Sequence, residues 1–408
     1  MASPEQDSQG VEPARRTAIL LVTRGGRGFI DGMVSIVLAR YLGGLGFSGV
    51  QVGAIITATL VGSALFTIGV GIAARAVDTR RVLLFACALM FATGVGFAGF
   101  SGVWPLMVVA FVGTLNPSNG DVSVFLPVEQ AALAVAGRDS VHRTSLFARY
   151  NVVGTFAGAL GALCAGAPGA LAARLGGASL IGDRLVFVAY AAVALVCAGF
   201  YARLEPARSS GRPATPARSR TTILKLAALF SLDSFGGGFA LQSLVVLWLY
   251  RRFHLSAQVA GGIFFTAGLA GALSQFLSPR VARRLGLVRT MVYTHLPANL
   301  FLIAAGLMPR VELAIAFLLL RAALSQMDVP ARQSLVMTLV PAEERAAAAS
   351  ITNVPRSLAA AFPPLLTGLM LDRSSLGWPL ICAGALKAIY DLVLLATRPE
   401  PTSGESHV

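Results

Sequence analysis

A charged stripe in the first apolar stretch is the strongest chemical feature of the sequence. Arg24, Arg27 and Asp31 are spaced three and four residues apart, so they share one face of a helix. Charged side chains inside an apolar helix are costly, and they usually face a water-filled cavity or one another. We therefore expect Arg27 and Asp31 to pair and to line a substrate cavity. Arg24 either joins them or extends to the membrane surface.

A second acidic position lies in the apolar stretch 223–249. Asp233 is followed by Gly236-Gly237-Gly238 and then by Gln242. Small residues permit a helix break or close helix packing in membranes. We assign Asp233 and Gln242 to the same cavity, and Asp31 and Asp233 become candidates for proton coupling or cation contact. Asp233 is the favoured proton carrier, because Arg27 would keep Asp31 ionised. Alternatively, both acids only hold helices together.

Two further Asp–Arg combinations have matching positions. Asp121 and Arg149 are equally distant from the middle of one loop, and Asp328 and Arg356 are placed in the same way about another. Equal distance from the loop of an antiparallel helix pair means similar depth. We predict two ion pairs that act either as gates or as static clamps. Because residues 116–120 have the composition of a turn, either the helix breaks inside the membrane there or Asp121 lies in the loop.

No arrangement of residues indicates catalysis. The four histidines are scattered without an HExxH pattern, and the glycines at 25–28 lack the Lys-Ser/Thr ending of a phosphate loop. The four cysteines lie in apolar stretches without metal-ligand spacing. We expect no enzyme activity, no catalytic residue, no metal and no cofactor, so any transport must use ion or solute gradients.

The elements that position these residues are membrane helices. The chain has 408 residues, of which 55% are hydrophobic and only 13% charged, whereas a soluble domain carries about a quarter charged residues. A membrane-spanning helix needs about 20 apolar residues, and strict polar–apolar alternation, which marks a barrel strand, is absent. The prediction is an all-α membrane protein with twelve transmembrane helices, near 17–41, 50–73, 82–101, 104–126, 145–167, 185–201, 223–249, 258–279, 290–308, 311–335, 348–371 and 377–396.

Loop charges predict the orientation. Most arginines lie in alternate loops, so these loops and both termini are expected in the cytoplasm. This distribution explains the net charge of +14 without nucleic acid. We predict a multi-pass protein of the cytoplasmic (inner) membrane. It is expected to be a monomer in the lipid bilayer, with a small-molecule substrate and protons as partners and no nucleic acid.

The chain also divides into similar halves. A Pro-, Ser- and Arg-rich segment, 203–222, reads as a cytoplasmic linker between an N-terminal half at 1–202 and a C-terminal half at 223–408. Adding 207 to a position of the first half aligns Asp121 with Asp328 and Arg149 with Arg356. Charged residues that coincide in this way inside a membrane protein are rare by chance. They indicate two pseudo-symmetric six-helix halves.

These features resemble the major facilitator superfamily over essentially the whole length. The family's basic loop between its second and third helices is matched in part: Gly71, Arg80 and Arg81 fit the pattern, whereas Asp78 replaces a glycine and Arg75 stands in place of an aspartate. The resemblance implies that the first helix of each half lines a central cavity. It also implies transport by alternating access.

The predicted function is secondary active transport of a small solute, in the form of proton-coupled export. The direction follows from what is frequent in the resembled family. One alternative is uptake of an organic anion, which Arg24 and Arg27 suggest. Another is a membrane sensor that binds a ligand without moving it.

Overall fold

Helices make up the regular structure of the part of the chain that the computed structural model describes, which is residues 4–73, 78–117, 125–136, 140–205, 220–340 and 345–397. Up to residue 205 the helices are α1 (Pro4–Gly44), α2 (Gly49–Ala73), α3 (Thr79–Gly99), α4 (Val103–Val112), α5 (Phe125–Ala136), α6 (Ser140–Cys164), α7 (Ala167–Arg174) and α8 (Ser179–Tyr201). From residue 220 they are α9 (Arg220–Gly238), α10 (Gln242–Phe253), α11 (Ala257–Leu285), α12 (Leu287–Leu307), α13 (Val311–Ser325), α14 (Asp328–Leu339), α15 (Arg345–Ala361), α16 (Pro363–Arg373) and α17 (Trp378–Thr397). The all-α prediction is confirmed.

Several of the predicted spans consist of two shorter helices in succession. The pairs are α4 with α5, α6 with α7, α9 with α10, α13 with α14, and α15 with α16. Glycine and proline lie at several of these junctions: α9 ends in a glycine triplet, and α16 begins with Pro363 and Pro364. Both residue types end or kink helices. Near the turn expected at 116–120, α4 ends at Val112 and residues 113–117 are not helical, whereas residues 118–124, with Asp121, lie outside the described residues.

Ten helical stretches of the described residues are long and apolar enough to cross a membrane. The first predicted span, in α1, is not among them because Arg24, Arg27 and Asp31 interrupt its apolar sequence. The fourth is not among them because α4 is a short apolar helix of 10 residues. With these two included, the helices account for all twelve predicted spans.

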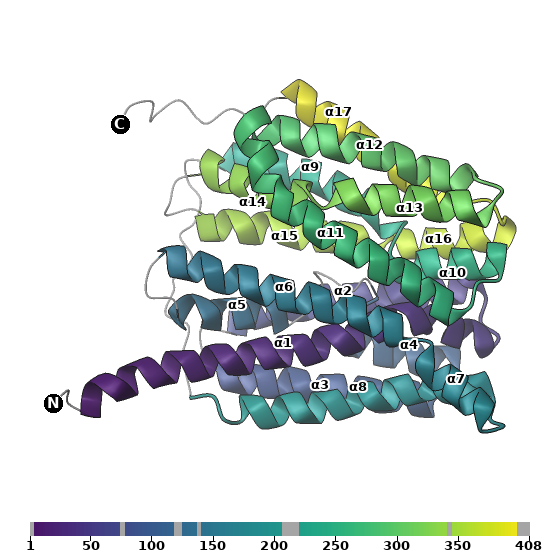
Figure 1. The fold of residues 1–408 in the computed structure, drawn as a ribbon, viewed down its shortest axis with the longest axis horizontal. Coiled ribbons are helices and arrows are strands. Elements are labelled where there is room, and N and C mark those ends of the chain that lie inside the picture. The colour runs from purple at the N-terminus through teal and green to yellow at the C-terminus, as the bar shows by residue number, and fades with distance from the viewer. Residues whose placement is uncertain are drawn as a thin grey trace. The chain divides into compact units, whose positions relative to one another are not determined.

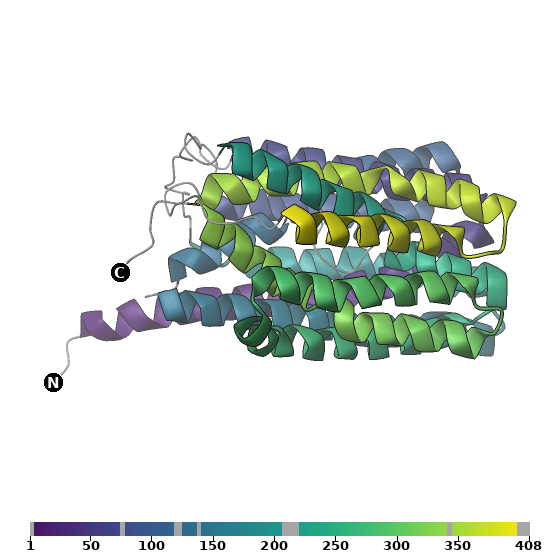
Figure 2. The same ribbon diagram turned by 90° about the horizontal axis from the view of Figure 1, so that it is seen from above.

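The helices form two units (Figures 1 and 2). Unit 1 contains Met1–Phe47, Val61–Gly211 and Ser256–Phe265, and unit 2 contains Ser48–Leu60, Arg212–Leu255 and Thr266–Val408. Helices α2 and α11 therefore each contribute residues to both units, a detail that the predicted division at 203–222 does not contain. Glycines explain it: a Cβ on Gly53 would lie 2.2 Å from the carbonyl oxygen of Pro364, and one on Gly261 would lie 2.2 Å from that of Ala162.

Unit 1 is held together by close packing of α1 against α6. A Cβ on Gly32 would lie 2.0 Å from the carbonyl oxygen of Gly158, and one on Gly28 would lie 2.8 Å from that of Gly154. Pairs of glycines four residues apart allow two membrane helices to approach to backbone contact. This close approach fixes the position of the charged face of α1.

Unit 2 is built around α9, which packs against α15 and α17, while α12 packs against α13 and α17. Its apolar core includes Phe230 of α9, Met291 of α12, Leu335 of α14 and Tyr390 of α17. The charged residues of these helices therefore lie in a packed helix bundle.

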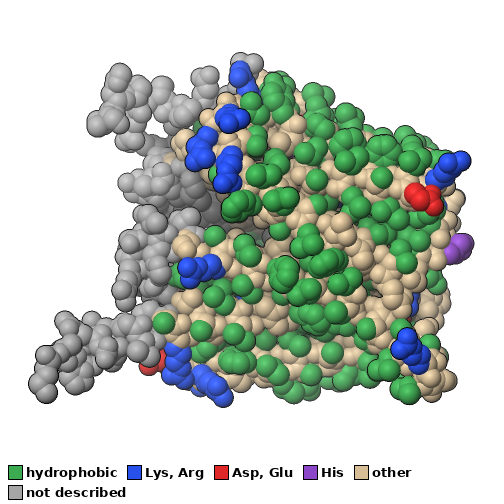
Figure 3. All heavy atoms as spheres, viewed as in Figure 1, with side chains coloured by type: hydrophobic (Ala, Val, Ile, Leu, Met, Phe, Trp, Pro, Cys, Tyr) green, Lys and Arg blue, Asp and Glu red, His purple; other side chains and the backbone are tan. Residues whose placement is uncertain are grey.

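The surface matches a lipid environment. Large apolar side chains are exposed on many helices, among them Trp104, Phe156, Phe276 and Leu273. Figure 3 shows hydrophobic side chains spread over the visible helix surfaces, with Lys and Arg gathered near the helix ends. Apolar surface of this extent is unfavourable in water, and lipid covers it at no such cost. The chain is a multi-pass membrane protein.

Candidate functional site

Glu129 is the centre of a buried polar cluster in unit 1. This residue of α5 is fully buried, and its carboxylate forms an ion pair with Arg27, which is 2% exposed. Tyr150 of α6 and Tyr201 of α8 donate their hydroxyl groups to the same carboxylate, the latter at 2.5 Å. Thr23 of α1 completes the set at 3.3 Å. Four helices thus meet at one carboxylate whose charge is matched by one guanidinium.

The expected pairing of Arg27 with Asp31 is therefore corrected, because the ion-pair partner of Arg27 is Glu129. Asp31 is buried, with 7% exposure, and forms no ion pair among the described residues. The guanidinium of Arg24 lies over the ring of Tyr150, 5.1 Å from its centroid, and its Nε has no hydrogen-bond partner in the described residues. The three residues share α1, but their side chains have different partners.

Asp233 is the centre of the corresponding cluster in unit 2. One carboxylate oxygen lies 2.5 Å from Nζ of Lys387 on α17, and the other lies 3.2 Å from Arg332 on α14. Arg332 also pairs with Asp328, 3.4 Å away on its own helix. All four residues are buried. Two cations hold Asp233 against α14 and α17, so the reasoning that favoured Asp233 over Asp31 as the proton carrier no longer applies.

A histidine–aspartate pair lies next to this cluster. His295 of α12 places Nδ1 2.9 Å from Oδ1 of Asp391 on α17, and Asn299 donates to the other oxygen of Asp391 at 2.8 Å. On the opposite side of the ring, Nε2 of His295 is 3.9 Å from Asp233. His295 and Asp391 are 3% and 0% exposed. Lys387 and Asp391 lie one turn apart on α17, but the ion-pair partner of each is on another helix.

The two predicted Asp–Arg pairs differ in what the structure shows. Asp121 lies outside the described residues, and Arg149 is exposed on α6. Asp328 pairs with Arg332, one turn away, in place of Arg356. Arg356 donates to Ser234 of α9 at 3.1 Å and to Asn353 of α15 at 3.3 Å. Depth alone did not select the partners, because a nearer arginine on the same helix competes for Asp328.

The remaining predicted residues occupy helix ends. Gln242 is half-buried at the start of α10. Within the loop motif, Gly71 lies in the last turn of α2, and Asp78 caps α3 by accepting a hydrogen bond from the backbone N–H of Arg80 at 3.2 Å. Arg80 is partly exposed, and Arg81 is exposed. Asp is a favourable N-cap residue, so Asp78 stabilises the start of α3 at a position where the family has glycine.

Sequence reasoning missed Glu129 as a site residue, and it took His295 for an isolated histidine. Glu129 was overlooked because the fourth predicted span ended at residue 126, three residues before it, at the start of α5. A single acid in the apolar run Phe125–Ala136 was the available signal. His295 had a weaker signal, one histidine in the middle of an apolar span, and its partner is 96 positions away. Only folding brings these residues together.

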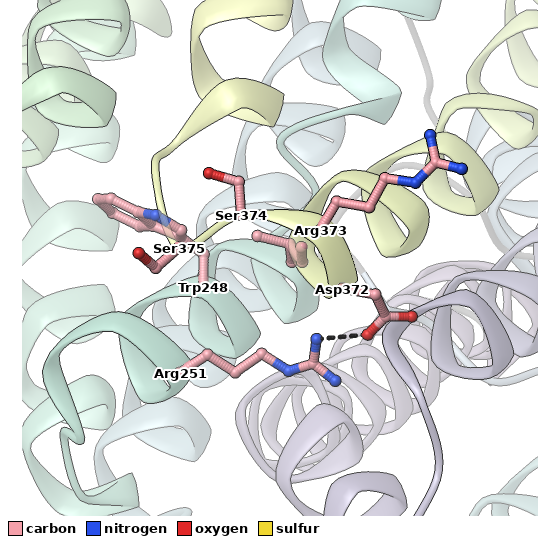
Figure 4. A pocket seen from close by; sticks show the side chains of 7 residues that line it. Trp248, Arg251, Asp372, Arg373, Ser374 and Ser375 are labelled. Atoms are coloured by element: carbon pink, nitrogen blue, oxygen red, sulfur yellow. Dashed lines mark hydrogen bonds and ion pairs between the residues drawn. The ribbon is translucent and has the colours of Figure 1, made fainter.

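A pocket of about 270 Å³ in unit 2 involves other residues. Its lining consists of Trp248, Arg251, Leu371, Asp372, Arg373, Ser374 and Ser375. Figure 4 shows Arg251 and Asp372 pointing toward each other, at 2.7 Å, while Arg373 extends away from them. Asp372 also accepts hydrogen bonds from the backbone N–H groups of Gly49 and Val50, so it caps α2. None of the predicted cavity residues lines this pocket.

Comparison with a family model decides the classification of this helical arrangement. The model described as "Major Facilitator Superfamily" matches residues 19–324 and 234–407. The chain belongs to the major facilitator superfamily. The resemblance predicted from the repeated halves and the basic loop is thereby confirmed.

Solved structures share the fold of this superfamily member. The nucleoside transporter NupG superimposes with a TM-score of 0.73 at 14% identity, covering 93% of this chain and 99% of NupG. A D-xylose-proton symporter gives 0.73 at 17% identity, with coverage of 95% and 99%. A bacterial homologue of the iron transporter ferroportin gives 0.72 at 17% identity, with coverage of 94% and 98%. At these identities the similarity concerns the fold, a twelve-helix transporter fold.

A yeast protein is similar in sequence. The "Uncharacterized membrane protein YJR124C" of Saccharomyces cerevisiae is 26% identical over 401 residues, which covers 89% of each chain. The likeness extends along nearly the full length of both proteins.

Proposed function

We propose that this superfamily member is a secondary active transporter that exports a small solute in exchange for protons by alternating access. The observation that carries the proposal is the buried charge on the first helix of each half, Arg27 and Asp31 on α1 and Asp233 on α9. Buried ionisable groups in membrane helices are expensive and mark substrate or proton pathways. The transporter fold of the superfamily gives such groups a function.

Asp31 is the proton-coupling carboxylate in this proposal. A carboxylate that exchanges a proton must exist in both charge states, and a cation in direct contact opposes its protonation. Arg332 and Lys387 contact Asp233, whereas Asp31 forms no ion pair with the described residues. Asp233 then orders the helices of unit 2. Arg24 and Asp31 of unit 1 and Gln242 of unit 2 are the proposed substrate contacts.

Uptake of an organic anion is the second candidate. It requires guanidinium groups available to an anionic substrate. Glu129 neutralises Arg27 in the structure, so this candidate now depends on Arg24, whose Nε is buried without a hydrogen-bond partner among the described residues. Proton exchange is better supported, because it uses a carboxylate that forms no ion pair with the described residues.

The first experiment identifies the substrate. Untargeted metabolite comparison between cells with and without the protein should show a solute that accumulates in cells lacking it. Proteoliposomes loaded with that solute should release it faster when a proton gradient, acidic outside, is applied. A solute that instead accumulates inside cells containing the protein would favour uptake.

Asp31→Asn then tests the coupling. The variant should lose gradient-driven transport while retaining exchange of labelled for unlabelled solute, because the amide has no proton to release. Glu312→Gln, which removes an exposed acid near the start of α13, is the matched control and should behave as the wild type. Uphill transport by Asp31→Asn with normal proton dependence would assign coupling to another group.

We propose that the protein lies in the cytoplasmic (inner) membrane, with both termini in the cytoplasm. A reporter fused after residue 210 and another fused at the C-terminus should both report cytoplasm. A reporter on the outside at either position would contradict the orientation derived from the loop arginines.

A further inference from the structure

Unit 2 contains an ionic network that the residues proposed for transport do not explain. Its carboxylates are Asp233, Asp328 and Asp391, and its permanent cations are Lys387 and Arg332. These five groups carry three negative charges and two positive ones. Every one is buried. Unmatched charge in a packed membrane bundle is strongly unfavourable, so the three carboxylates favour further positive charge close to them.

We propose that His295 and Asp391 form a proton-binding site in unit 2, with the proton held on Nε2 of His295. The contact of 2.9 Å between Nδ1 and the Asp391 carboxylate requires a proton between the two atoms, because two lone pairs would repel. In the tautomer that we infer, Nδ1–H donates to Asp391, and Asn299 donates to the second carboxylate oxygen. This arrangement leaves Nε2 as the ring nitrogen that gains or loses a proton.

The groups around the ring favour its positive form. Asp391 of α17 contacts one side, and Asp233 of α9 lies 3.9 Å from the other. The ring of Tyr390, also on α17, stands edge-on with its centroid 6.1 Å away. Of the cations of the network, Arg332 and Lys387 contact Asp233 directly, and Lys387 also interacts electrostatically with Asp391.

One more cation lies on a neighbouring helix. Arg321 of α13 interacts with Asp233 electrostatically and makes no ion pair with the network among the described residues. It adds positive charge on the side of Asp233. A proton on His295 would place positive charge directly between the two carboxylates that flank the ring.

Proton binding at this site would change how α9 is held. Once Nε2 carries a proton, the imidazolium attracts Asp233 and competes with Lys387, which lies 2.5 Å from the same Oδ1 atom. Loss of the proton removes this competition and leaves Asp233 with Lys387. The proton thus biases the contact between α9 and α17. A role of this bias in transport rests on the proposed function, whereas the existence of the site does not.

Histidine NMR tests the site without a transported substrate. The sequence has four histidines, so the variant His142→Gln, His254→Asn, His407→Gln leaves His295 alone. Asn suits position 254 because His254 has a positive φ of 53°. The ¹⁵N-labelled full-length variant would be studied in lipid nanodiscs between pH 5 and 9. We expect the Nε2 resonance to change from the imidazolium to the neutral position within this range.

Asp391→Asn in the same background is the second arm. Because the carboxylate stabilises the imidazolium, its removal should lower the proton affinity of His295 about tenfold. Glu312→Gln in that background is the matched control and should leave the affinity unchanged. A ring that keeps one charge state from pH 5 to 9, or an affinity unaffected by Asp391→Asn, would overturn the proposal. Titration of His295 in a protein that moves no solute would instead contradict the proposed function and leave the site in place.

Discussion

The two units place a buried ion pair at corresponding elements with opposite polarity. In unit 1 the first helix supplies the cation, Arg27, and the second part of a broken helix, α5, supplies the acid, Glu129. In unit 2 the first helix supplies the acid, Asp233, and the second part of a broken helix, α14, supplies the cation, Arg332. A neutral pair stabilises the same helix contact with either polarity. The two halves therefore share the position of the ion pair and the helices that it joins, but the helix that supplies the acid in one half supplies the cation in the other.

The surroundings of these pairs differ more than the pairs themselves. Glu129 is surrounded by hydroxyl groups of Tyr150, Tyr201 and Thr23, which donate hydrogen bonds and carry no charge. Asp233 is surrounded by Lys387 and Arg332, with His295 close by. Unit 1 thus contains one matched pair that neutral donors support. Unit 2 contains a network in which a single proton changes the balance of charge.

The largest expected effect breaks the cluster of unit 1. Glu129→Ala would leave Arg27 as an unpaired buried charge and remove the acceptor of two tyrosine hydroxyl groups. We expect the free energy of unfolding in detergent to fall by about 3–5 kcal/mol. Glu129→Gln, which retains one acceptor oxygen, should lose less. Glu205→Ala removes an exposed acid and is the control; an equal loss in Glu129→Ala and Glu205→Ala would show that the cluster does not stabilise unit 1.

A double-mutant cycle in unit 2 should show a somewhat smaller effect. Asp233→Asn, Lys387→Gln and the double variant together give the interaction energy of the pair, which lies 2.5 Å apart. We expect about 1–3 kcal/mol of coupling. Each single change costs less than Glu129→Ala, because Arg332 keeps Asp328 as a partner. Additive losses in melting experiments would mean that Lys387 and Asp233 do not stabilise each other.

Helix packing provides a comparison that is independent of charge. Gly32→Ala places a methyl group 2.0 Å from the backbone oxygen of Gly158, so α1 and α6 of unit 1 must separate. We expect a loss of about 1–3 kcal/mol. Gly237→Ala on α9 is the matched substitution in unit 2, where the nearest atom is Nζ of Lys387 at 3.7 Å. Its unfolding midpoint should remain near that of the wild type, and equal losses at both positions would contradict the glycine contact.

The smallest effect is expected for the partly exposed pair in unit 2. Arg251 and Asp372 are 29% and 26% exposed, and water screens their attraction. Arg251→Gln should lower the free energy of unfolding by about 0–1 kcal/mol. The difference from the wild type should become smaller in high salt, because salt screens the pair. Arg40→Gln is the comparison in unit 1, where Asp183 is 5% exposed and a larger loss is expected. A loss at Arg251 above that at Arg40 would show that burial does not govern these pairs.

The sequence by itself determined the lipid environment, the number of spans and the family. Apolar stretches of membrane-spanning length and repeated charged residues can be recognised in the sequence without knowing which residues are in contact. The helix break after Gly238 also belongs here, since it depends on residues close in sequence. The positions of Arg27, Asp31 and Asp233 on their helices were predictable for the same reason.

Only the tertiary structure decided which charges meet. Arg27 and Asp31 share a face of α1, yet Arg27 binds Glu129 from a helix that begins nearly a hundred residues later. Lys387 and Asp391 are one turn apart on α17, yet one binds Asp233 and the other His295. A long charged side chain in a membrane interior selects the partner that best compensates its lost hydration, and that partner can come from any neighbouring helix. Helix packing, which the glycines of α1 and α6 set in unit 1, determines which neighbours are available.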